Sequence, residues 1–312
     1  MSTTLTVPEA LAGTRLDRAL AQLLDVSVGT ARRVLARDLV RVDGRRPHKG
    51  DAVAKGAIVD VAVARLDEAG VAWLVGEASE ASEALLLAIL FVDDDVIIVD
   101  KPAGMPCHPL VPGEGGTAVD ALIGRHPEIA NASEEPREAG LVHRIDTGTS
   151  GCLAVARTRA SWARLREAFA NPAAVAKRYL AVVEGAVAGP LVLDGGIAHD
   201  ERDSRRMRLA RDGKPAVTRA RPLATAARAS LVLVDAAEGG RRHQVRVHLA
   251  GAGHPLVGDV LYGAAPAVDA PWHLLHALSL ELPGKPRVDA QISSAFAKAA
   301  SARGLVVPSG AI

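Results

Sequence analysis

The apolar residues of this 312-residue chain come in short runs separated by turn residues and charged residues. The longest run, from Ala84 to Val92, has the length of a buried strand or a short helix, whereas a helix that spans a membrane needs about 18 apolar residues. Hydrophobic residues make up 49% of the chain, which excludes a mostly disordered protein. Because the length exceeds the usual size of one domain, we expect one large and one smaller globular domain.

The net charge of +1 hides a segregation of charge along the chain. Residues 1–65 carry eleven Lys or Arg against seven Asp or Glu, and residues 66–95 carry eight acidic residues and no basic one. Residues 137–180 and 201–221 each carry eight basic and three acidic residues. Such blocks favour basic faces that bind a polyanion such as nucleic acid, although arginine-rich faces that are simply solvated give the same pattern.

Three absences narrow the class of protein further. The first ten residues lack the basic start and the apolar stretch of a secretory signal, so we expect a cytoplasmic protein without a membrane partner. The two cysteines, Cys107 and Cys152, make neither a disulfide framework nor a zinc site. The histidines between residues 243 and 276 show no recognisable spacing of metal ligands, and we expect no bound metal.

The N-terminal segment has the spacing of two helices followed by a hairpin. Apolar residues from Leu16 to Leu24 recur at intervals of three and four, as on one face of a helix. Ser27 has the side chain of an N-cap for a second helix. Asp43-Gly44 is a tight-turn signal, and a strand over Ile58 to Val63 follows it. The second helix presents three basic residues, Arg32, Arg33 and Arg37.

This arrangement resembles the ribosomal protein S-four-like RNA-binding domain over residues 13–63. The matching positions are Arg15-Leu16-Asp17, Ser27 and the turn at Gly44, where Asp43 replaces the family's usual Asn. The resemblance implies a small α/β module that binds structured RNA with the basic face formed by Arg32, Arg33 and Arg37. A plain two-helix packing unit, whose arginines complement the helix C-terminus, remains the alternative. Residues 64–85, rich in Ala, Glu and Ser, are interpreted as an acidic linker.

Residues 86–312 are expected to form the second domain. An apolar strand begins at Leu86, the turn Asp93-Asp94-Asp95 follows, and a second strand covers Val96 to Val99. Ala160 to Ala170 has helical spacing. Alternation of apolar and polar residues predicts three further strands, at 175–184, 231–235 and 243–250. In the last of these, Gln244, Arg246 and His248 would share one face.

A charged tripeptide followed by a turn rich in Gly, Thr and Ser, within residues 140–151, carries the clearest chemical signal. Asp146 lies there on a loop of small residues behind two apolar ones, a position suited to a ligand. An ordinary turn, in which the Asp146 carboxylate bonds nearby backbone amides, is the simpler interpretation of the spacing alone.

This segment closely resembles the signature loop of the RluA-type pseudouridine synthases, H-R-L-D-x-x-T-S-G. Here residues 143–151 are His-Arg-Ile-Asp-Thr-Gly-Thr-Ser-Gly, with Ile145 in place of Leu as the one departure. The resemblance extends over residues 88–283, and further segments match the family in the same order, at 101–104, 108–109, 177–185, 240–248, 258–263 and 275–277.

The resemblance implies that the chain isomerises uridine to pseudouridine in RNA. It assigns Asp146 as the catalytic carboxylate, Arg246 as its electrostatic support, and Tyr179 as a ring that stacks near the flipped uracil. Whether Asp146 attacks the sugar or removes a proton from it stays open. Arg144 is similar to the family's filler for the vacated base position. Further candidates for RNA binding are His143, which could instead hold the loop, Lys177 and Gln244. Neither a cofactor nor a metal is required.

The fold implied is α+β, a mostly antiparallel central sheet with flanking helices and a catalytic cleft, plus the small N-terminal domain. We expect a monomer that binds structured RNA, with large-subunit ribosomal RNA favoured and transfer RNA second. A non-catalytic RNA-binding or ribosome-assembly protein is an alternative class, but intact Asp146, Tyr179 and Arg246 argue against it. A glycoside hydrolase would need a second acid across the cleft, and the matching segments supply one acid and many bases.

Overall fold

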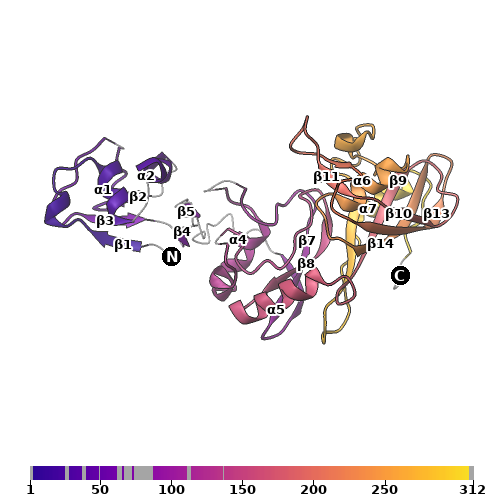
Figure 1. Ribbon diagram of the computed structural model, residues 1–312, viewed down its shortest axis with the longest axis horizontal. Coiled ribbons are helices and arrows are strands. Elements are labelled where there is room, and N and C mark those ends of the chain that lie inside the picture. Colours follow the sequence, from indigo (N-terminus) through magenta and orange to yellow (C-terminus); the bar gives the residue numbers. More distant parts are fainter. Residues whose placement is uncertain are drawn as a thin grey trace. The chain divides into compact units, whose positions relative to one another are not determined.

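The computed structural model describes residues 3–24, 28–36, 40–48, 50–61, 65–66, 72–73, 87–110, 114–135 and 137–308. They belong to two compact units, one within residues 1–86 and 108–140 and the other within residues 87–107 and 141–312 (Figure 1). In the part of the chain that the structure describes, no helix combines the length and the apolar character needed to cross a bilayer.

A small antiparallel sheet with two helices forms the N-terminal part of the first unit. Its strands lie in the order β1 (Thr3–Thr6), β3 (Ile58–Val61) and β2 (Val40–Val42). The helices are α1 (Leu16–Leu23) and α2 (Val28–Ala36), and the short η1 (Glu9–Leu11) precedes them. Leu16 and Leu20 of α1 and Val34 of α2 pack with Val59 and Val61 in one core. Because β1 pairs with β3, the fold begins before residue 13, the boundary expected from the sequence.

The helices and strands predicted for this region are confirmed where the structure describes them. Ser27 and Arg37 lie outside the described residues, and so does the side chain of Arg33. The predicted linker 64–85 is described only at two short paired strands, β4 (Arg65–Leu66) and β5 (Ala72–Trp73). The first unit also contains α4 (Ala118–Ile123) and the 3-10 helix η2 (Pro127–Asn131).

The second unit is built on a sheet of nine strands in the described residues. Its spatial order is β10 (Leu191–Asp194), β13 (Val217–Thr225), β14 (Ala229–Glu238), β9 (Ala176–Glu184), β15 (Leu275–Glu281), β8 (Ser150–Ala156), β7 (Val96–Lys101) and β6 (Ala88–Val92), with β16 (Val288–Asp289) paired to β15. β8 and β15 run parallel, and the other described pairs are antiparallel. The predicted α+β fold with a mostly antiparallel sheet is therefore confirmed.

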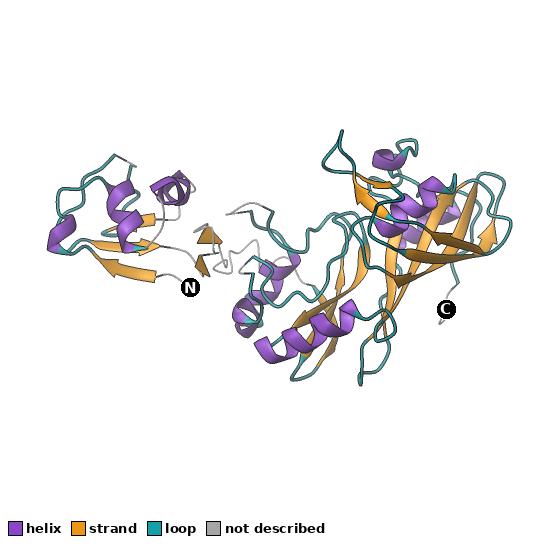
Figure 2. Cartoon of the chain, viewed as in Figure 1, coloured by secondary structure: helices purple, strands orange, loops and turns teal. Residues whose placement is uncertain are grey.

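Helices lie against both faces of this sheet (Figure 2). Successive side chains of a strand point to opposite faces, and both faces of β9 pack against helices. Leu180 and Val182 pack with Phe296 of α7 (Ser294–Ser301), whereas Ala181 and Val183 pack with residues of α6 (Gln244–Gly251) on the other face. The helix predicted at 160–170 is confirmed as α5 (Arg159–Ala170), whose buried Leu165 packs in a third core with β7 and β8.

The strand predicted at 243–250 is wrong, because these residues form α6. The alternation of apolar and polar residues is real, but it does not separate a buried face from a solvated one: every residue from Gln244 to Leu249 is buried. Val245 and Leu249, one helical turn apart, pack in the same core, and the polar side chains between them find polar partners inside the protein. Gln244 and Arg246 therefore do not line a strand.

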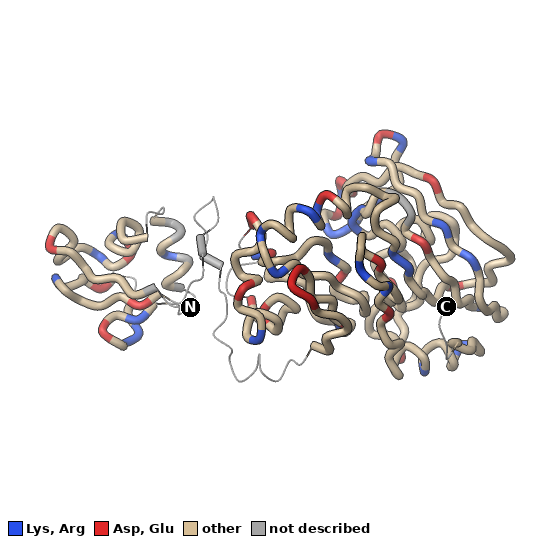
Figure 3. The backbone as a smooth tube through the Cα atoms, turned by 90° about the horizontal axis from the view of Figure 1, so that it is seen from below, with Lys and Arg blue, Asp and Glu red and all other residues tan. Residues whose placement is uncertain are grey.

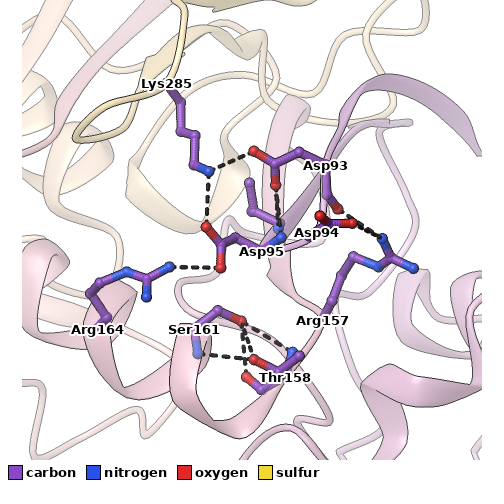
Figure 4. Close-up of polar contacts among 9 residues, drawn as sticks. Asp93, Asp94, Asp95, Arg157, Thr158, Ser161, Arg164 and Lys285 are labelled. Atoms are coloured by element: carbon purple, nitrogen blue, oxygen red, sulfur yellow. Dashed lines mark hydrogen bonds and ion pairs between the residues drawn. The ribbon is translucent and has the colours of Figure 1, made fainter.

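The acidic turn between β6 and β7 is neutralised by basic side chains from distant segments (Figure 4). The Lys285 ammonium donates to Asp93 at 2.6 Å and to Asp95 at 3.0 Å. Arg164 of α5 pairs with Asp95 at 2.7 Å. The Asp93 carboxylate also accepts the backbone N–H groups of Asp95 and Val96, both at 2.9 Å, which is the Asx-type turn expected at this sequence.

Candidate active site

Asp146 lies on the loop that leads into β8. The Thr149 N–H donates to the Asp146 carbonyl oxygen at 2.9 Å, which closes a turn. The Asp146 carboxylate, however, pairs with a distant residue: Nη1 of Arg246 donates to Oδ2 of Asp146 at 3.0 Å. The side chain of Asp146 keeps 23% of its surface exposed. A carboxylate that is held by an arginine and still open to solvent is available to a ligand.

Arg246 is fixed by a second carboxylate, Asp259. Nε and Nη2 of Arg246 donate to the two oxygens of Asp259 at 2.7 and 2.9 Å, a bidentate pair. Both side chains are buried. Arg246 thus presents its remaining nitrogen to Asp146 in one orientation. The sequence alone assigns Asp259 no role, although its presence in a segment that matches the family is a usable signal.

The charges around Asp146 favour its ionised form. Burial acts to raise the pKa of Asp146, but the charge of His243 when that imidazole is protonated and the charge of Arg246 outweigh it, and the pKa lies below the usual range. Burial lowers the pKa of His243 to about 4. His243 is therefore neutral near pH 7, and Arg246 is the cation that keeps Asp146 charged.

His243 caps α6 in a left-handed backbone conformation, with φ of 56°, which is uncommon for a residue other than glycine. Its Nδ1 lies 2.8 Å from the Tyr262 hydroxyl, which also accepts the backbone N–H of Met207 at 2.8 Å. Its Nε2 lies 3.8 Å from Oδ1 of Asp146. Electrostatics favours the tautomer in which Tyr262 donates to Nδ1, because the Nε2–H then faces the carboxylate.

Tyr179 lies on β9, on the face that packs against α6. Burial raises the pKa of its phenol, and the negative charge of Asp146 adds to the effect. The ring is therefore neutral at physiological pH and lies within the electrostatic reach of Asp146. The structure thus pairs Asp146 with Arg246 directly, and it places Tyr179 on the face of β9 that packs against α6, the helix that carries Arg246.

Lys101, at the end of β7, supports the Asp146 loop from below the surface. It is fully buried, and its ammonium donates to three backbone carbonyls, those of Pro102, Met105 and Thr147, at 3.0, 2.7 and 3.2 Å. Burial lowers the pKa of Lys101 to about 8. Because Thr147 follows Asp146 directly, this lysine holds the catalytic loop in place. In the sequence, Lys101 stands out only as part of a matching segment.

His143 and Lys177, both candidates for RNA binding, take part in a side-chain cluster around Phe169. His143 stacks on the Phe169 ring with centroids 4.5 Å apart, and its Nε2 accepts the backbone N–H of Ala154 at 2.9 Å. Burial lowers the pKa of His143 to about 3, so it is neutral. The Lys177 ammonium lies 5.9 Å from the centre of the same ring. These contacts support the alternative in which His143 holds the loop.

The other two candidates of this unit differ in exposure. Gln244 is buried, and its amide bonds the Val217 carbonyl, the Thr218 hydroxyl and the Arg241 N–H. We therefore assign Gln244 to the interior rather than to RNA. Arg144, two residues before Asp146, is exposed.

The candidate RNA-binding arginines of the N-terminal domain belong to the first unit, whereas Asp146 belongs to the second. Nε of Arg32 donates to the buried Asp17 at 2.8 Å, and more than half of its side chain is exposed. The hydrogen bonds of Arg15 and Arg32 lower the pKa of Asp17 to about 2. Arg37 and the side chain of Arg33 fall outside the described residues.

Charged residues of both signs recur along the backbone of each unit (Figure 3). In the described residues, no group of three His, Cys, Asp or Glu side chains is arranged so that it could hold a metal ion. The centre of the site is instead a network of two carboxylates, one guanidinium and a neutral imidazole.

Comparison with known proteins gives consistent results. Residues 95–251 match the family described as RNA pseudouridylate synthase. The chain is 38% identical to "Ribosomal large subunit pseudouridine synthase D" of Nitrosomonas europaea, over 89% of this chain and 79% of that protein. It is 37% identical to the protein of the same name from Xanthomonas campestris, over 83% of this chain and 74% of that one.

Solved structures of similar fold include two human proteins. "Human RNA Pseudouridylate Synthase Domain Containing 1" aligns with a TM-score of 0.53 and 25% identity, over 67% of this chain and 83% of that one. "Human RNA Pseudouridylate Synthase Domain Containing 4" aligns with a TM-score of 0.58 over 73% of this chain and 97% of that one, and at 23% identity it bears on the fold alone.

Proposed function

This chain belongs to the RNA pseudouridylate synthase family and isomerises uridine to pseudouridine in RNA, and we propose that its substrate is large-subunit ribosomal RNA. The relatives from Nitrosomonas europaea and Xanthomonas campestris, which carry that substrate in their names, support the proposal because they match most of this chain. Transfer RNA is the alternative substrate for the same chemistry.

Asp146 is the proposed catalytic carboxylate, and its ion pair with Arg246 is the observation that supports this role most directly. The reaction breaks the bond between the anomeric carbon and N1 of uracil, and joins the same carbon to C5. The proton leaves C5 and N1 gains one, so atoms and electrons balance without an added group. An ionised carboxylate can attack the anomeric carbon or remove a proton from the sugar. Arg246 favours the ionised form, and Asp259 orients Arg246.

We propose that Tyr179 contacts the flipped uracil and that Arg144 fills the position in the RNA that the uridine leaves. A uridine inside folded RNA must leave the stack before Asp146 can reach it, at a cost of a few kcal/mol. Arg144 is exposed on the same loop, which suits a side chain that fills the vacated position. Tyr179 is neutral and can both pack against the flipped uracil and exchange a proton late in the reaction.

The N-terminal domain, expected at residues 13–63 and extended in the structure by the paired strand β1, would supply affinity for structured RNA. Its basic balance and the exposed guanidinium of Arg32 support a phosphate-binding surface. Residues 66–85 carry five acidic residues and no basic one, a charge that does not attract RNA and that suits a linker.

The proposal is tested with unmodified large-subunit ribosomal RNA transcribed in vitro. Wild-type protein should introduce pseudouridine at one or a few positions, mapped by carbodiimide labelling and reverse transcription. Asp146→Asn keeps the size of the side chain and loses its charge, so it should abolish turnover while RNA affinity stays within a few-fold. Modification of transfer RNA alone would replace the proposed substrate by the alternative. Multiple turnover by Asp146→Asn would remove Asp146 from the catalytic role.

A further inference from the structure

Trp272 is a large aromatic side chain that stays 45% exposed beside the catalytic loop. Its indole lies against the backbone of Gly104, and its Cβ lies near Gly148. A Cβ atom placed on Gly104 would lie 2.9 Å from the indole Nε1, and one placed on Gly148 would lie 3.3 Å from the Cβ of Trp272. Gly148 is two residues from Asp146, and the Gly104 N–H donates to the Thr147 carbonyl at 2.8 Å. The tryptophan thus rests on the loops that position the catalytic carboxylate.

The neighbouring residues anchor Trp272 to the same site. His273 points inward, where it is buried and its Nε2 lies 2.8 Å from the hydroxyl of Thr149. The backbone carbonyl of Trp272 lies next to Gly258, directly before Asp259: a Cβ on that glycine would come within 2.9 Å of this oxygen. The segment is therefore fixed on the inner side while the indole remains open on the outer side.

Trp162 is a tryptophan of this chain whose side chain has a structural role inside the protein. It is half-buried on α5, it packs in a core, and its indole N–H donates to the Leu141 carbonyl at 2.9 Å. Trp272 instead leaves nearly half of its surface in water, beside the loop of Asp146.

We propose that Trp272 is a stacking platform for a base of the RNA beside the target uridine. The inference rests on the proposed function. When the uridine leaves the stack, the bases beside it lose a stacking partner, and an exposed indole can replace that partner without reading the sequence. Trp272 lies against the loops of Gly104 and Gly148 beside Asp146, so a base stacked on its indole holds the flipped nucleotide near the carboxylate.

The first test measures binding of a fluorescein-labelled 12-nucleotide oligouridylate by anisotropy. Trp272→Ala should weaken binding roughly 5- to 150-fold, the range expected for one base stacked on an aromatic ring. Trp272→Phe keeps an aromatic face and should bind within about threefold of wild type. Trp162→Phe is the matched control and should bind as wild type does. Circular dichroism establishes that each variant is folded.

The second test uses an abasic ribose-phosphate oligomer of the same length and charge. Wild type should bind it more weakly than oligouridylate, and this difference in affinity should be smaller for Trp272→Ala. Oligouridylate should also quench the tryptophan fluorescence of wild type and of Trp162→Phe, but not that of Trp272→Phe. Unchanged affinity of folded Trp272→Ala, or full quenching in Trp272→Phe, would overturn the stacking role and leave Trp272 as a cover for the glycine loops.

These binding measurements do not depend on which RNA the enzyme modifies. Failure of wild type to modify large-subunit ribosomal RNA would refute the proposed substrate, whereas loss of the tryptophan effect would refute the platform. With an RNA that wild type modifies, Trp272→Ala should raise KM and leave the single-turnover rate at saturating RNA within a few-fold, because the indole does not touch the reacting atoms.

Discussion

Arg246 donates to Asp146 through one nitrogen and to Asp259 through two others, so its replacement affects two carboxylates. Arg246→Ala should lower the single-turnover rate by roughly 100-fold or more, as loss of a charge-stabilising donor does in other enzymes, with RNA affinity within a few-fold. Arg246→Lys keeps the charge without the forked geometry and should recover only part of the rate. A rate that survives Arg246→Ala while RNA affinity falls would assign the arginine to RNA binding.

The free energy of unfolding of the Arg246 variants distinguishes the Arg246–Asp259 pair from the Arg246–Asp146 pair. Arg246→Ala leaves Asp259 buried without its partner, which should cost about 3–5 kcal/mol of the free energy of unfolding. Adding Asp259→Asn should restore much of that stability but not the turnover, because Asp146 still lacks its cation. Urea denaturation and single-turnover rates of the single and double variants provide the measurement.

The depressed pKa of Asp146 predicts the pH dependence of catalysis. Activity requires the carboxylate, which is present above its folded pKa and is lost as pH falls through it. The single-turnover rate of wild type should therefore be flat from pH 7 down to pH 5 and fall only below the ordinary Asp value of about 4. In Arg246→Ala, burial acts without the arginine and raises this pKa, so the acid limb of the residual rate should move to higher pH. An acid limb at the same pH in both proteins would contradict the assigned role of Arg246.

Single residues also mark the limit of what the sequence can reveal. Asp146, Tyr179 and Arg246 could be found because they stand in recognisable segments. Asp259 and Lys101 stand in such segments too, but their roles depend on partners that the fold brings from elsewhere: the Arg246 guanidinium for one and the Thr147 carbonyl for the other. No local pattern reports that Trp272 is exposed beside Gly148.

At the scale of elements, strands were predictable where an apolar run is bounded by turn or charged residues. The apolar pattern predicts β7 and β9, and helical spacing predicts α5, each close to the observed bounds. The pattern failed at α6, whose polar residues are buried with partners such as Thr218, which pairs with both Gln244 and His248. An alternation of apolar and polar residues predicts which face of an element is buried only when the polar residues face water.

The turn between β6 and β7 should make part of the stability depend on acid pH. Hydrogen bonds with Lys285 and Arg164 lower the pKa of Asp95. Burial acts to raise the pKa of Asp93, but the hydrogen bonds from Lys285 and from the backbone N–H groups of Asp95 and Val96 together outweigh it. This contribution is present above the unfolded pKa of about 4 and is lost as pH falls through the lower folded pKa values. Lys285→Met should lower the free energy of unfolding by about 0.5–1 kcal/mol at pH 7, a modest value because the pairs are partly solvated.

The control for that turn is Lys298→Met, which removes an exposed lysine from α7. Its effect on stability should be smaller and independent of acid pH. Chemical denaturation at pH 7 and at pH 3 measures both variants. A difference between Lys285→Met and wild type that persists unchanged at pH 3 would show that the ion pairs are not its source.

For the whole molecule, the N-terminal domain should contribute affinity and its salt dependence. Deletion of residues 1–70 should weaken binding of structured RNA. It should also reduce the slope of log affinity against log salt by about 0.7 to 0.9 for each phosphate that the truncated protein no longer neutralises. Affinity measured at several salt concentrations, with circular dichroism of the truncated protein, is the test. An unchanged slope would indicate that Arg32 and its neighbours are a solvated face.

The place of β15 in the sheet has a consequence for the order in which the enzyme becomes active during its synthesis. Residues 275–281 form the strand that joins β6, β7 and β8 to β9, β14, β13 and β10. A ribosome releases both groups of strands before it releases β15. Asp146 accompanies the first group, while Tyr179 and Arg246 accompany the second. We therefore expect the carboxylate and its arginine to meet only after the joining strand has emerged, so that a nascent chain stays inactive toward RNA until β15 has left the ribosome.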